Sequence, residues 1–394
     1  MSKDKAKYCE YCLPQKRRNH IIPYLSYYFD NFRHRAFRGS SKKQPRMWPI
    51  LLETLALFGL VKFEPNPDKK RLFNRSLIFF EEAKRRNIDI YSVKILGIYT
   101  NDFKFKFCKK AYYYEGIPTF ATGKHNYLID DKSYFKKILK AESYPHPAGN
   151  KFTKKNDALL YAKRLKGPFV IKPINGSLSQ HASYPVEKNK LSKAIDIVKK
   201  YSPGFIMEEF IDGDLYRVTV INKKYVLVAK KIPPNIIGDG INSVKKLVNI
   251  KNNNRANSEI INKTLHKIVL DKKAIKHLSI IGLGINKVPK KGKIVYLSDK
   301  YVLSHGCDVV GCTKKIDPST KMMFIELAKK IDSDLIGFDY ITKDIEKGFK
   351  KQKSAIIEAN SMPFVDLHQN PSGGESDKVA EIIWNEVLDG LVKL

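Results

Sequence analysis

Apolar residues recur at two different spacings along the chain, and together these spacings predict a mixed α and β fold. In "NRSLIFFEEAKRRN" (74–87), Leu77, Phe80 and Ala83 recur every three residues, which is typical of one face of a helix. The following "IDIYSVKILGIY" (88–99) alternates or runs apolar, which is typical of a strand. The two segments predict a small α/β unit ahead of the main domain.

Helical and strand-like segments alternate through the rest of the chain. A helix is predicted over 129–143, where Asp130 or Asp131 can serve as the N-cap. Residues 235–300 are rich in Asn and Lys and predict a partly ordered excursion. The remaining predicted elements are helices over 156–167 and 190–201, strands on both sides of a loop within 168–186, several strands within 204–233, and helix, strand, strand, loop and helix from 321 onward. The expected fold class is therefore α+β or α/β, with no internal repeat.

The most apolar run of the chain is "PILLETLALFGLV", from Pro49 to Val61. It is too short to span a membrane, and it carries Glu53. We therefore expect a buried helix here and no membrane span.

The charge of the chain is strongly positive. At 394 residues it is long enough for two or three domains, and its formal net charge is +33. This charge fits an anionic partner such as a nucleotide, nucleic acid, an acidic peptide or a membrane surface. It also fits a composition bias, because Lys, Ile, Asn and Tyr are all abundant and the basic residues are spread along the chain. Both interpretations stay open.

The first 45 or so residues are basic and aromatic, with Arg and Lys interleaved with Tyr and Phe. Such a segment can bind nucleic acid. An amphipathic helix with a solvated cationic face is the commoner outcome, so nucleic acid is the less favoured partner.

The five cysteines are few and unevenly spaced. An odd count without a signal peptide predicts a reducing, cytoplasmic location. Cys9 and Cys12 form half of a zinc site without an evident second half, so free thiols are favoured. Cys307 and Cys312 are interpreted as packing residues.

Hard oxygen ligands gather near the end of the chain. "AIIEANSMPF" places Glu358 and Asn360 two residues apart on a predicted strand, so their side chains point to one face. "LIGFDYI" places Asp339 on another apolar strand. Mg²⁺ prefers carboxylates combined with nucleotide phosphates, so the three residues predict a magnesium site.

Lys172 lies in the apolar strand "VIKP". A buried ammonium is costly unless it meets an anion, and a nucleotide phosphate is such an anion. The alternative is a lysine whose charge reaches the surface. The adjoining "NGSLSQHAS" loop could cover phosphates with backbone N–H groups, although it is not a Walker loop.

Two further segments carry charge on apolar strands. In "FIMEEFIDGD", Glu208 and Glu209 could accept hydrogen bonds from adenine or ribose, or could simply belong to a charged turn. In "LYRVTV" and "LVAKKI", Arg217 offers a fork for a carboxylate or phosphate and Lys230 a compact charge. Together Arg217 and Lys230 could neutralise an acyl phosphate and a γ-phosphate.

From about Lys124 onward the chain resembles the ATP-grasp superfamily, in particular the ligase domain of cyanophycin synthetase and the fused glutathione synthetases. The resemblance rests on "FIMEEFIDGDLYRVTVINKKYVLVAKKIPPNIIGDGINSVKKLV" and on "IIEANSMPFVDLHQNPSGGESDKVAEII". The charged sites also follow the order of that family: Lys132, Lys172, Glu208 and Glu209, Arg217, Lys230, Asp339, Glu358 and Asn360.

The resemblance implies an ATP-grasp fold in which two α+β subdomains clasp ATP, preceded by a small α/β N-terminal domain. The implied boundaries are a basic extension over 1–70, the small domain over 71–123, subdomain 1 over 124–207 and subdomain 2 with the metal site over 208–394. The implied roles are nucleotide binding by Lys132, Lys172, Glu208, Glu209, Phe210, Ile211 and Asp214, catalysis by Arg217 and Lys230, and Mg²⁺ binding by Asp339, Glu358 and Asn360, with Mn²⁺ as a second candidate metal.

The implied activity is ATP-dependent ligation of a carboxylate to an amine through an acyl phosphate. The implied substrates are ATP and an amino acid or peptide, an acidic one if the charge is functional; a homo-oligomer stays open. Relatives often hold the ribose with an acidic residue where this chain has Leu215, next to Asp214. His368 and Ser372 either contact substrate or cap the last helix. The alternative function is a basic nucleic-acid- or partner-binding protein with a degenerate ATP-grasp domain.

Overall fold

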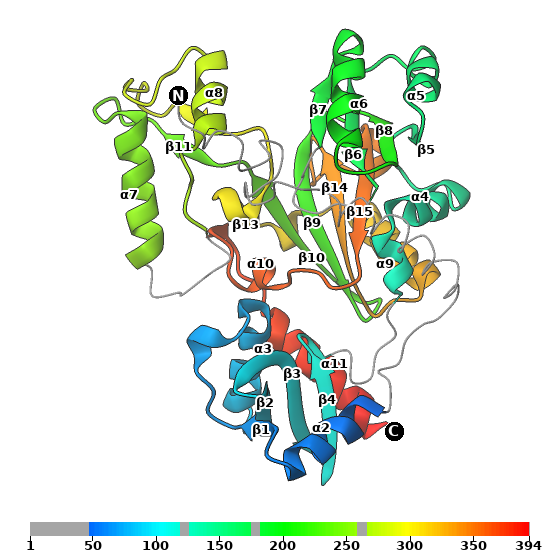
Figure 1. Cartoon of the computed structure of the whole chain (residues 1–394), viewed down its shortest axis with the longest axis vertical. Helices are drawn as coiled ribbons and strands as arrows, with labels where there is room; N and C mark the ends of the chain where they lie inside the picture. The colour runs from blue at the N-terminus through cyan, green and yellow to red at the C-terminus, as the bar shows by residue number, and fades with distance from the viewer. Residues whose placement is uncertain (1–46, 119–125, 175–181, 258–265, 394) are drawn as a thin grey trace. The chain divides into compact units, whose positions relative to one another are not determined.

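The computed structural model describes residues 47–118, 126–174, 182–257 and 266–393 (Figure 1). The basic aromatic N-terminus with Cys9 and Cys12, and residues 175–181 of the predicted phosphate loop, lie outside these ranges. The chain divides into two compact units. The first contains Tyr127–Asp214 and Phe338–Ala359, and the second contains the described residues of Ser41–Asn126, Leu215–Gly337 and Asn360–Leu394.

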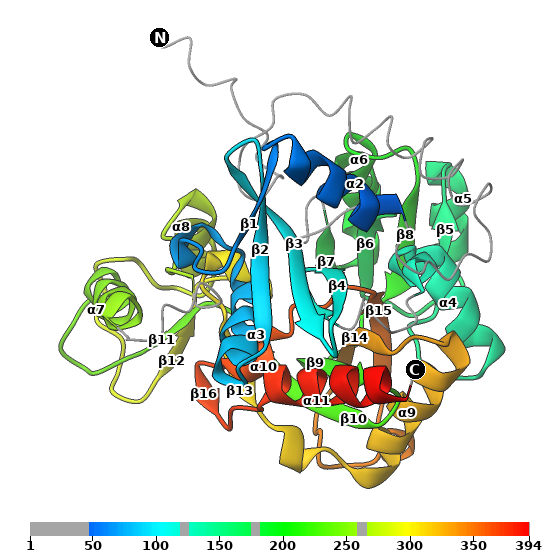
Figure 2. The same ribbon diagram turned by 90° about the horizontal axis from the view of Figure 1, so that it is seen from below.

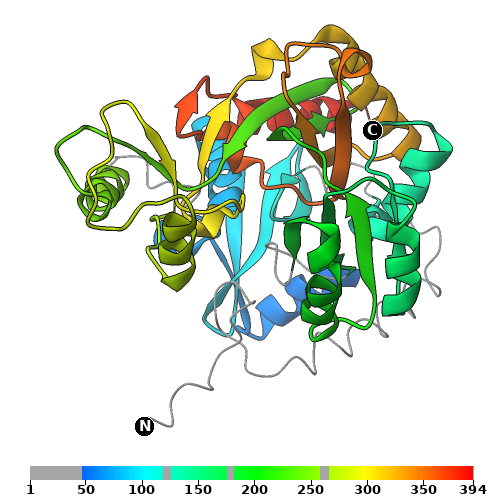
Figure 3. The ribbon, with the colours of Figure 1, turned by 90° about the horizontal axis from the view of Figure 1, so that it is seen from above.

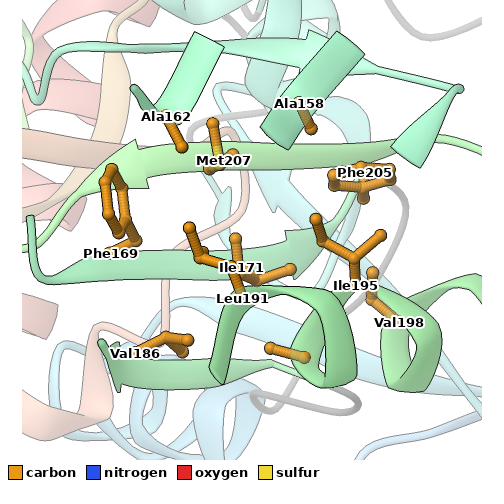
Figure 4. Packing of buried hydrophobic residues seen from close by; sticks show 11 residues of the cluster. Ala158, Ala162, Phe169, Ile171, Val186, Leu191, Ile195, Val198, Phe205 and Met207 are labelled. Atoms are coloured by element: carbon orange, nitrogen blue, oxygen red, sulfur yellow. The ribbon is translucent and has the colours of Figure 1, made fainter. Parts of the chain in front are cut away.

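The first unit is built on a four-stranded antiparallel sheet with the order β5–β8–β6–β7. Its strands are β5 (Gly149–Phe152), β6 (Phe169–Pro173), β7 (Ser183–Val186) and β8 (Phe205–Glu209), and its helices are α4 (Lys132–Ala141), α5 (Lys155–Ala162) and α6 (Leu191–Lys199). Side chains of α5 and α6 pack on one face of the sheet around Phe169, Ile171, Phe205 and Met207 (Figure 4). Because side chains alternate along a strand, the residues next to these four in β6 and β8 point to the other face of the sheet.

A six-stranded sheet has the order β15–β14–β9–β10–β13–β16. Its strands are β9 (Asp214–Ile221), β10 (Tyr225–Ile232), β13 (Asp308–Gly311), β14 (Leu335–Thr342), β15 (Ser354–Asn360) and β16 (Gly373–Gly374). Strand β10 is buried along most of its length, so both of its faces are covered.

The N-terminal part of the second unit is an antiparallel sheet in the order β1–β2–β3–β4. Its elements are α2 (Met47–Leu57), β1 (Val61–Glu64), α3 (Asn74–Arg85), β2 (Asp89–Ile95), β3 (Ile98–Phe107) and β4 (Lys110–Glu115). The C-terminal helix α11 (Val379–Val392) packs against α3 (Figure 2). Trp384 Nε1 donates to Phe79 O at 2.9 Å. Helices α9 (Pro318–Ile331) and α10 (Asp366–Gln369) also belong to this unit.

The predicted excursion over 235–300 is instead an ordered lobe within the described residues (Figure 3, yellow-green). It contains β11 (Asn235–Ile237), α7 (Val244–Asn257), α8 (Lys272–Ile280) and β12 (Ile294–Tyr296), which enclose a hydrophobic core of their own. Asp308 at the start of β13 connects the lobe to the six-stranded sheet, because it accepts hydrogen bonds from Lys251 Nζ and Arg255 Nη2 of α7, each at 2.6 Å.

Two predicted elements differ from the structure. The run from Pro49 to Val61 is not one buried helix: α2 ends at Leu57, and Leu57 and Phe58 are 86% and 74% exposed. The segment 88–99 is not one strand, because Leu96 and Gly97 both have positive φ and form a two-residue hairpin turn between β2 and β3. Among the residues that the structure describes, no helix is long and apolar enough to cross a membrane.

Candidate active site

Lys172 and Glu208 lie on the face of the first unit's sheet that does not carry α5 and α6. The register pairs Lys172 with Ile206 and Val170 with Glu208. Lys172 and Glu208 are therefore diagonal neighbours on one face, while Ile171 and Met207 point into the core on the other. The distance from Lys172 Nζ to Glu208 Oε2 is 2.8 Å, so the buried ammonium has an anion as its partner.

Helix α4 brings two more lysines to the same charge cluster. Asp131 caps the helix by accepting from the backbone N–H groups of Ser133 and Tyr134. Lys132 and Lys136 are four residues apart and therefore share a face. Lys136 Nζ lies 2.6 Å from Glu208 Oε1, and Lys132 Nζ lies 3.1 Å from the carboxylate of Glu358 on β15.

Burial and these contacts shift the ionisation of the cluster. Burial alone would raise the pKa of Glu208, but Lys172 and Lys136 outweigh burial and lower that pKa below its usual value. Burial alone would also lower the pKa of Lys172, but Glu208 and the charges of Glu358 and Asp339 outweigh it and raise that pKa. The three lysines are therefore balanced by three carboxylates within the first unit.

The predicted magnesium ligands lie on two strands. Asp339 is buried on β14, and Glu358 and Asn360 are alternate residues of β15 with buried Ala359 between them. No group of three or more His, Cys, Asp or Glu side chains in the described ranges is arranged to hold a metal ion. Two carboxylates and an amide fit Mg²⁺, which takes one or two carboxylates together with substrate phosphates, and do not fit an all-protein metal cage.

The residues predicted as the adenine hinge lie at the end of β8 and in the segment that leads to β9. Both carboxylate oxygens of Glu208 are held by lysines, and Glu209 is ion-paired to Lys353 at 2.5 Å. The backbone N–H of Phe210 donates to Pro168, and Ile211 is buried. Asp214 is the first residue of β9. The hinge role of these residues stays a prediction.

The second unit holds Arg217 and Lys230, but the structure does not bring them together. Arg217 on β9 is opposite Ala229 on β10, so Lys230, the next residue, points to the other face of the sheet. The register therefore places Arg217 and Lys230 on opposite faces of the sheet, and their catalytic role stays a prediction. Lys231, which is only 6% exposed, shares the face of Arg217. The sequence did not single it out, because β10 is buried on both faces and therefore shows no alternation of polar and apolar residues that would distinguish Lys231 from Lys230.

His368 also lies near the face of Arg217. Its Nε2 is 2.8 Å from Thr219 Oγ1, and its side chain is fully buried. Burial, together with the charges of Arg217 and Lys231, lowers the pKa of His368 to about 3, so the imidazole is neutral. Ser372 Oγ accepts from Val309 N at 2.8 Å and so links β13 to the residue before β16; it does not cap the last helix.

Cys307 and Cys312 are buried free thiols, as the packing interpretation expects. Burial raises the pKa of Cys307 to about 12 and that of Cys312 to about 11, which makes both thiols unreactive near neutral pH.

Comparison with known proteins places this geometry in context. No protein-family model matches the chain. It is 31% identical over 260 residues to the cyanophycin synthetase of Nostoc sp., covering 66% of this chain and 29% of that protein. It is 30% identical over 278 residues to the glutathione biosynthesis bifunctional protein GshAB of Listeria monocytogenes, covering 68% of this chain and 36% of that protein. The chain thus spans about a third of the length of these curated relatives.

A solved structure supports the fold. The bifunctional glutathione synthetase from Pasteurella multocida superposes with a TM-score of 0.62 at 21% identity, covering 82% of this chain and 44% of that chain. The alternative of a basic binding protein with a degenerate domain is not favoured by these similarities. The chain therefore has the ATP-grasp fold and is homologous, over about two thirds of its length, to the cyanophycin synthetases and the bifunctional glutathione synthetases.

Proposed function

We propose that this protein is an ATP-dependent ligase that joins a carboxylate to an amine through an acyl phosphate. The observation that carries the proposal is the cluster of the first unit, in which Lys132 and Lys172 are each ion-paired to a carboxylate and Lys172 also experiences the charge of Asp339. Cations beside a pair of metal-binding carboxylates are what phosphoryl transfer from a metal-bound nucleotide requires. The similarity to cyanophycin synthetase and GshAB supports the same activity.

In this proposal Lys132 and Lys172 bind the nucleotide phosphates, and the segment from Glu208 to Ile211, with Asp214 nearby, borders the adenosine. Asp339, Glu358 and Asn360 would hold Mg²⁺, or Mn²⁺. The bound metal would offset charge on the phosphates and hold them for transfer. Arg217 supplies positive charge for the group being transferred. Lys231, which shares the face of Arg217, is a second candidate for this role beside the predicted Lys230.

The proposed reaction needs no protein nucleophile. A carboxylate oxygen of the first substrate attacks the γ-phosphorus of ATP, and the bond from that phosphorus to the β,γ-bridging oxygen breaks to release ADP. The amine nitrogen of the second substrate then attacks the acyl carbon, the carbon–oxygen bond to phosphate breaks, and the amine proton passes to solvent. The protein contributes positioning and charge neutralisation.

The substrates are proposed as amino acids or peptides. The net charge of +33 favours an acidic carboxylate donor. A screen of amino acids and dipeptides with Mg-ATP, read out as ADP and phosphate release, identifies the pair.

The acyl phosphate is tested with a donor labelled with ¹⁸O in its carboxylate. Transfer of one labelled oxygen to the released phosphate is expected, and unlabelled phosphate would overturn the proposed intermediate. Substrate-dependent ADP release that survives in the double variant Asp339→Ala and Glu358→Ala would overturn the site. Mg-ATP should also raise the melting temperature of the wild-type protein by mass action. No such shift, combined with salt-sensitive binding to RNA or DNA, would favour the alternative binding protein.

A further inference from the structure

Glu208 is shared between two lysines, only one of which lies on its own sheet. Lys172 on β6 meets Oε2 at 2.8 Å, and Lys136 on α4 meets Oε1 at 2.6 Å. The exposed fractions of the Lys136, Glu208 and Lys172 side chains are 17%, 6% and 14%. The three charges are therefore largely removed from water. Interactions between charges are stronger in the protein interior than in water.

We propose that Lys136 is a positioning residue for nucleotide binding, acting through Glu208 on Lys172. This inference rests on the proposed function, in which Lys172 binds a nucleotide phosphate. By occupying Oε1, Lys136 leaves Glu208 only one oxygen for Lys172, so that the ammonium of Lys172 keeps donors for the phosphate.

Charge gives Lys136 a second effect at the same site. With Lys136 the three lysines and three carboxylates of the cluster balance, and without it the cluster carries a net charge of −1, which disfavours an anionic ligand. Without Lys136, Glu208 is also free to hold Lys172 with both oxygens. A phosphate would then compete with a stronger carboxylate contact in a more negative site.

The orientation of helix α4 about its own axis explains why Lys136 has this role and Lys137 does not. Phe135 and Leu139 are buried at 2% and 1% exposure and fix the helix against the rest of the unit. Lys136 then points to Glu208, one turn from Lys132, which points to Glu358. Lys137 is exposed on the same helix, so it provides a matched control with the same charge.

The test measures binding of a fluorescent ATP analogue and steady-state kinetics for Lys136→Met, Lys136→Arg and Lys137→Met. Lys136→Met is expected to raise both the Kd of the nucleotide and the KM for ATP about tenfold or more, with kcat within about threefold of wild type. Lys137→Met is expected to stay within about threefold of wild type in all three quantities. Lys136→Arg, which keeps the charge but has a different shape, is expected to bind the nucleotide more tightly than Lys136→Met.

A charge rescue separates positioning from a merely structural role. The double variant Lys136→Met and Glu208→Gln restores the balance of charge in the cluster and removes the competing carboxylate, so it is expected to bind the nucleotide more tightly than Lys136→Met alone. A double variant that binds no better than Lys136→Met would overturn the proposal. If melting curves show that Lys136→Met does not fold, Lys136→Gln takes its place in both the single and the double variant.

The controls also separate this inference from the proposed function. If the wild type binds nucleotide and Lys136→Met binds it equally well, the role of Lys136 is wrong and the ligase assignment stands. If the wild type binds no nucleotide at all, the proposed function and the role of Lys136 fail together.

Discussion

Lys132 Nζ and Glu358 Oε1 lie 3.1 Å apart and connect helix α4 to strand β15. The exposed fractions of the two side chains are 11% and 32%, so the ion pair is only partly open to water. One contact therefore joins a lysine assigned to the nucleotide phosphates to a carboxylate assigned to the metal ion. We expect phosphate and metal binding to depend on each other here.

The variant Glu358→Gln tests the metal side of this contact. The amide keeps the shape of the side chain but loses the charge that attracts a divalent cation. We expect the Mg²⁺ concentration for half-maximal ADP release at saturating ATP to rise about tenfold or more. A Mg²⁺ titration measures this concentration.

Asp196→Asn is the control for loss of a carboxylate–lysine pair. Asp196 is 55% exposed and lies 2.7 Å from Lys155, so its loss should cost less than about 1 kcal/mol of unfolding free energy and leave the Mg²⁺ titration unchanged. Equal Mg²⁺ curves for wild type and Glu358→Gln would remove Glu358 from the metal site.

The adjacent lysines of β10 give a second test, because the register places them on opposite faces of the sheet. Lys231 shares the face of Arg217, whereas Lys230 does not. We expect Lys231→Met to lower kcat/KM by about tenfold or more and Lys230→Met to lower it by less than about threefold. Steady-state kinetics with melting curves for both variants measures this difference. The reverse order of effects would return the role to Lys230.

Gly149 supports Glu208 from the neighbouring strand. It is opposite Glu208 in the register, its φ is +157°, and a Cβ atom there would lie 2.2 Å from Met207 O. Gly149→Ala must therefore push β5 away from β8, and we expect it to cost about 1–3 kcal/mol of unfolding free energy and to weaken nucleotide binding. Urea denaturation and nucleotide titration measure the two effects.

Gly284→Ala is the matched control, because only Cγ of Lys287, at 3.9 Å, comes within 4 Å of an added Cβ. It should change the unfolding free energy by less than about 0.5 kcal/mol. If Gly149→Ala were as mild as this control, the close contact between β5 and β8 would be relieved without moving Glu208.

The apolar neighbours of Lys172 were enough to predict that its charge needs an anionic partner or a path to the surface. A lysine between Ile171 and Pro173 stands out because its neighbours are apolar, and the structure gives it the anionic partner that burial requires. The order of the charged sites likewise predicted the ATP-grasp fold, which structural similarity confirms. These signals are local or depend only on sequence order.

Lys136 and Lys231 could not be predicted in this way. Helix α4 carries Lys136, Lys137 and Lys140 close together, and only packing of the helix in the folded unit selects the lysine that meets Glu208. Strand β10 is apolar on both faces, so only its pairing with β9 distinguishes Lys230 from Lys231. Contacts between distant segments decide both cases.

In the apolar run before β1, the sequence predicted more burial than the structure shows. Its hydrophobicity predicted burial, but Gly59 has a φ of +71° and turns the chain after α2, so that β1 can begin at Val61. Leu57 and Phe58 remain on the surface beside this turn. Hydrophobicity alone therefore overstated how much of this run the fold covers.

Neutral, buried His368 makes stability depend on pH. Its pKa is lowered to about 3 in the folded protein by burial and by Arg217 and Lys231, against about 6.5 when unfolded. The unfolded chain therefore binds a proton below about pH 6.5 that the folded protein does not bind until about pH 3. This residue's contribution to stability is complete above pH 6.5 and declines as pH falls, by at most about 1.4 kcal/mol per pH unit.

The variant His368→Gln isolates this contribution from that of the many carboxylates. Glutamine can keep a hydrogen bond to Thr219 Oγ1, which lies 2.8 Å from His368 Nε2, but it cannot take up the proton. We expect the variant to be less stable than wild type at pH 7.5 and to lose about 2 kcal/mol less on going to pH 5. Urea denaturation at the two pH values measures the difference. Parallel losses in both proteins would mean that His368 titrates in the folded state much as it does in the unfolded chain, and that the positive charges of Arg217 and Lys231 are compensated at this face.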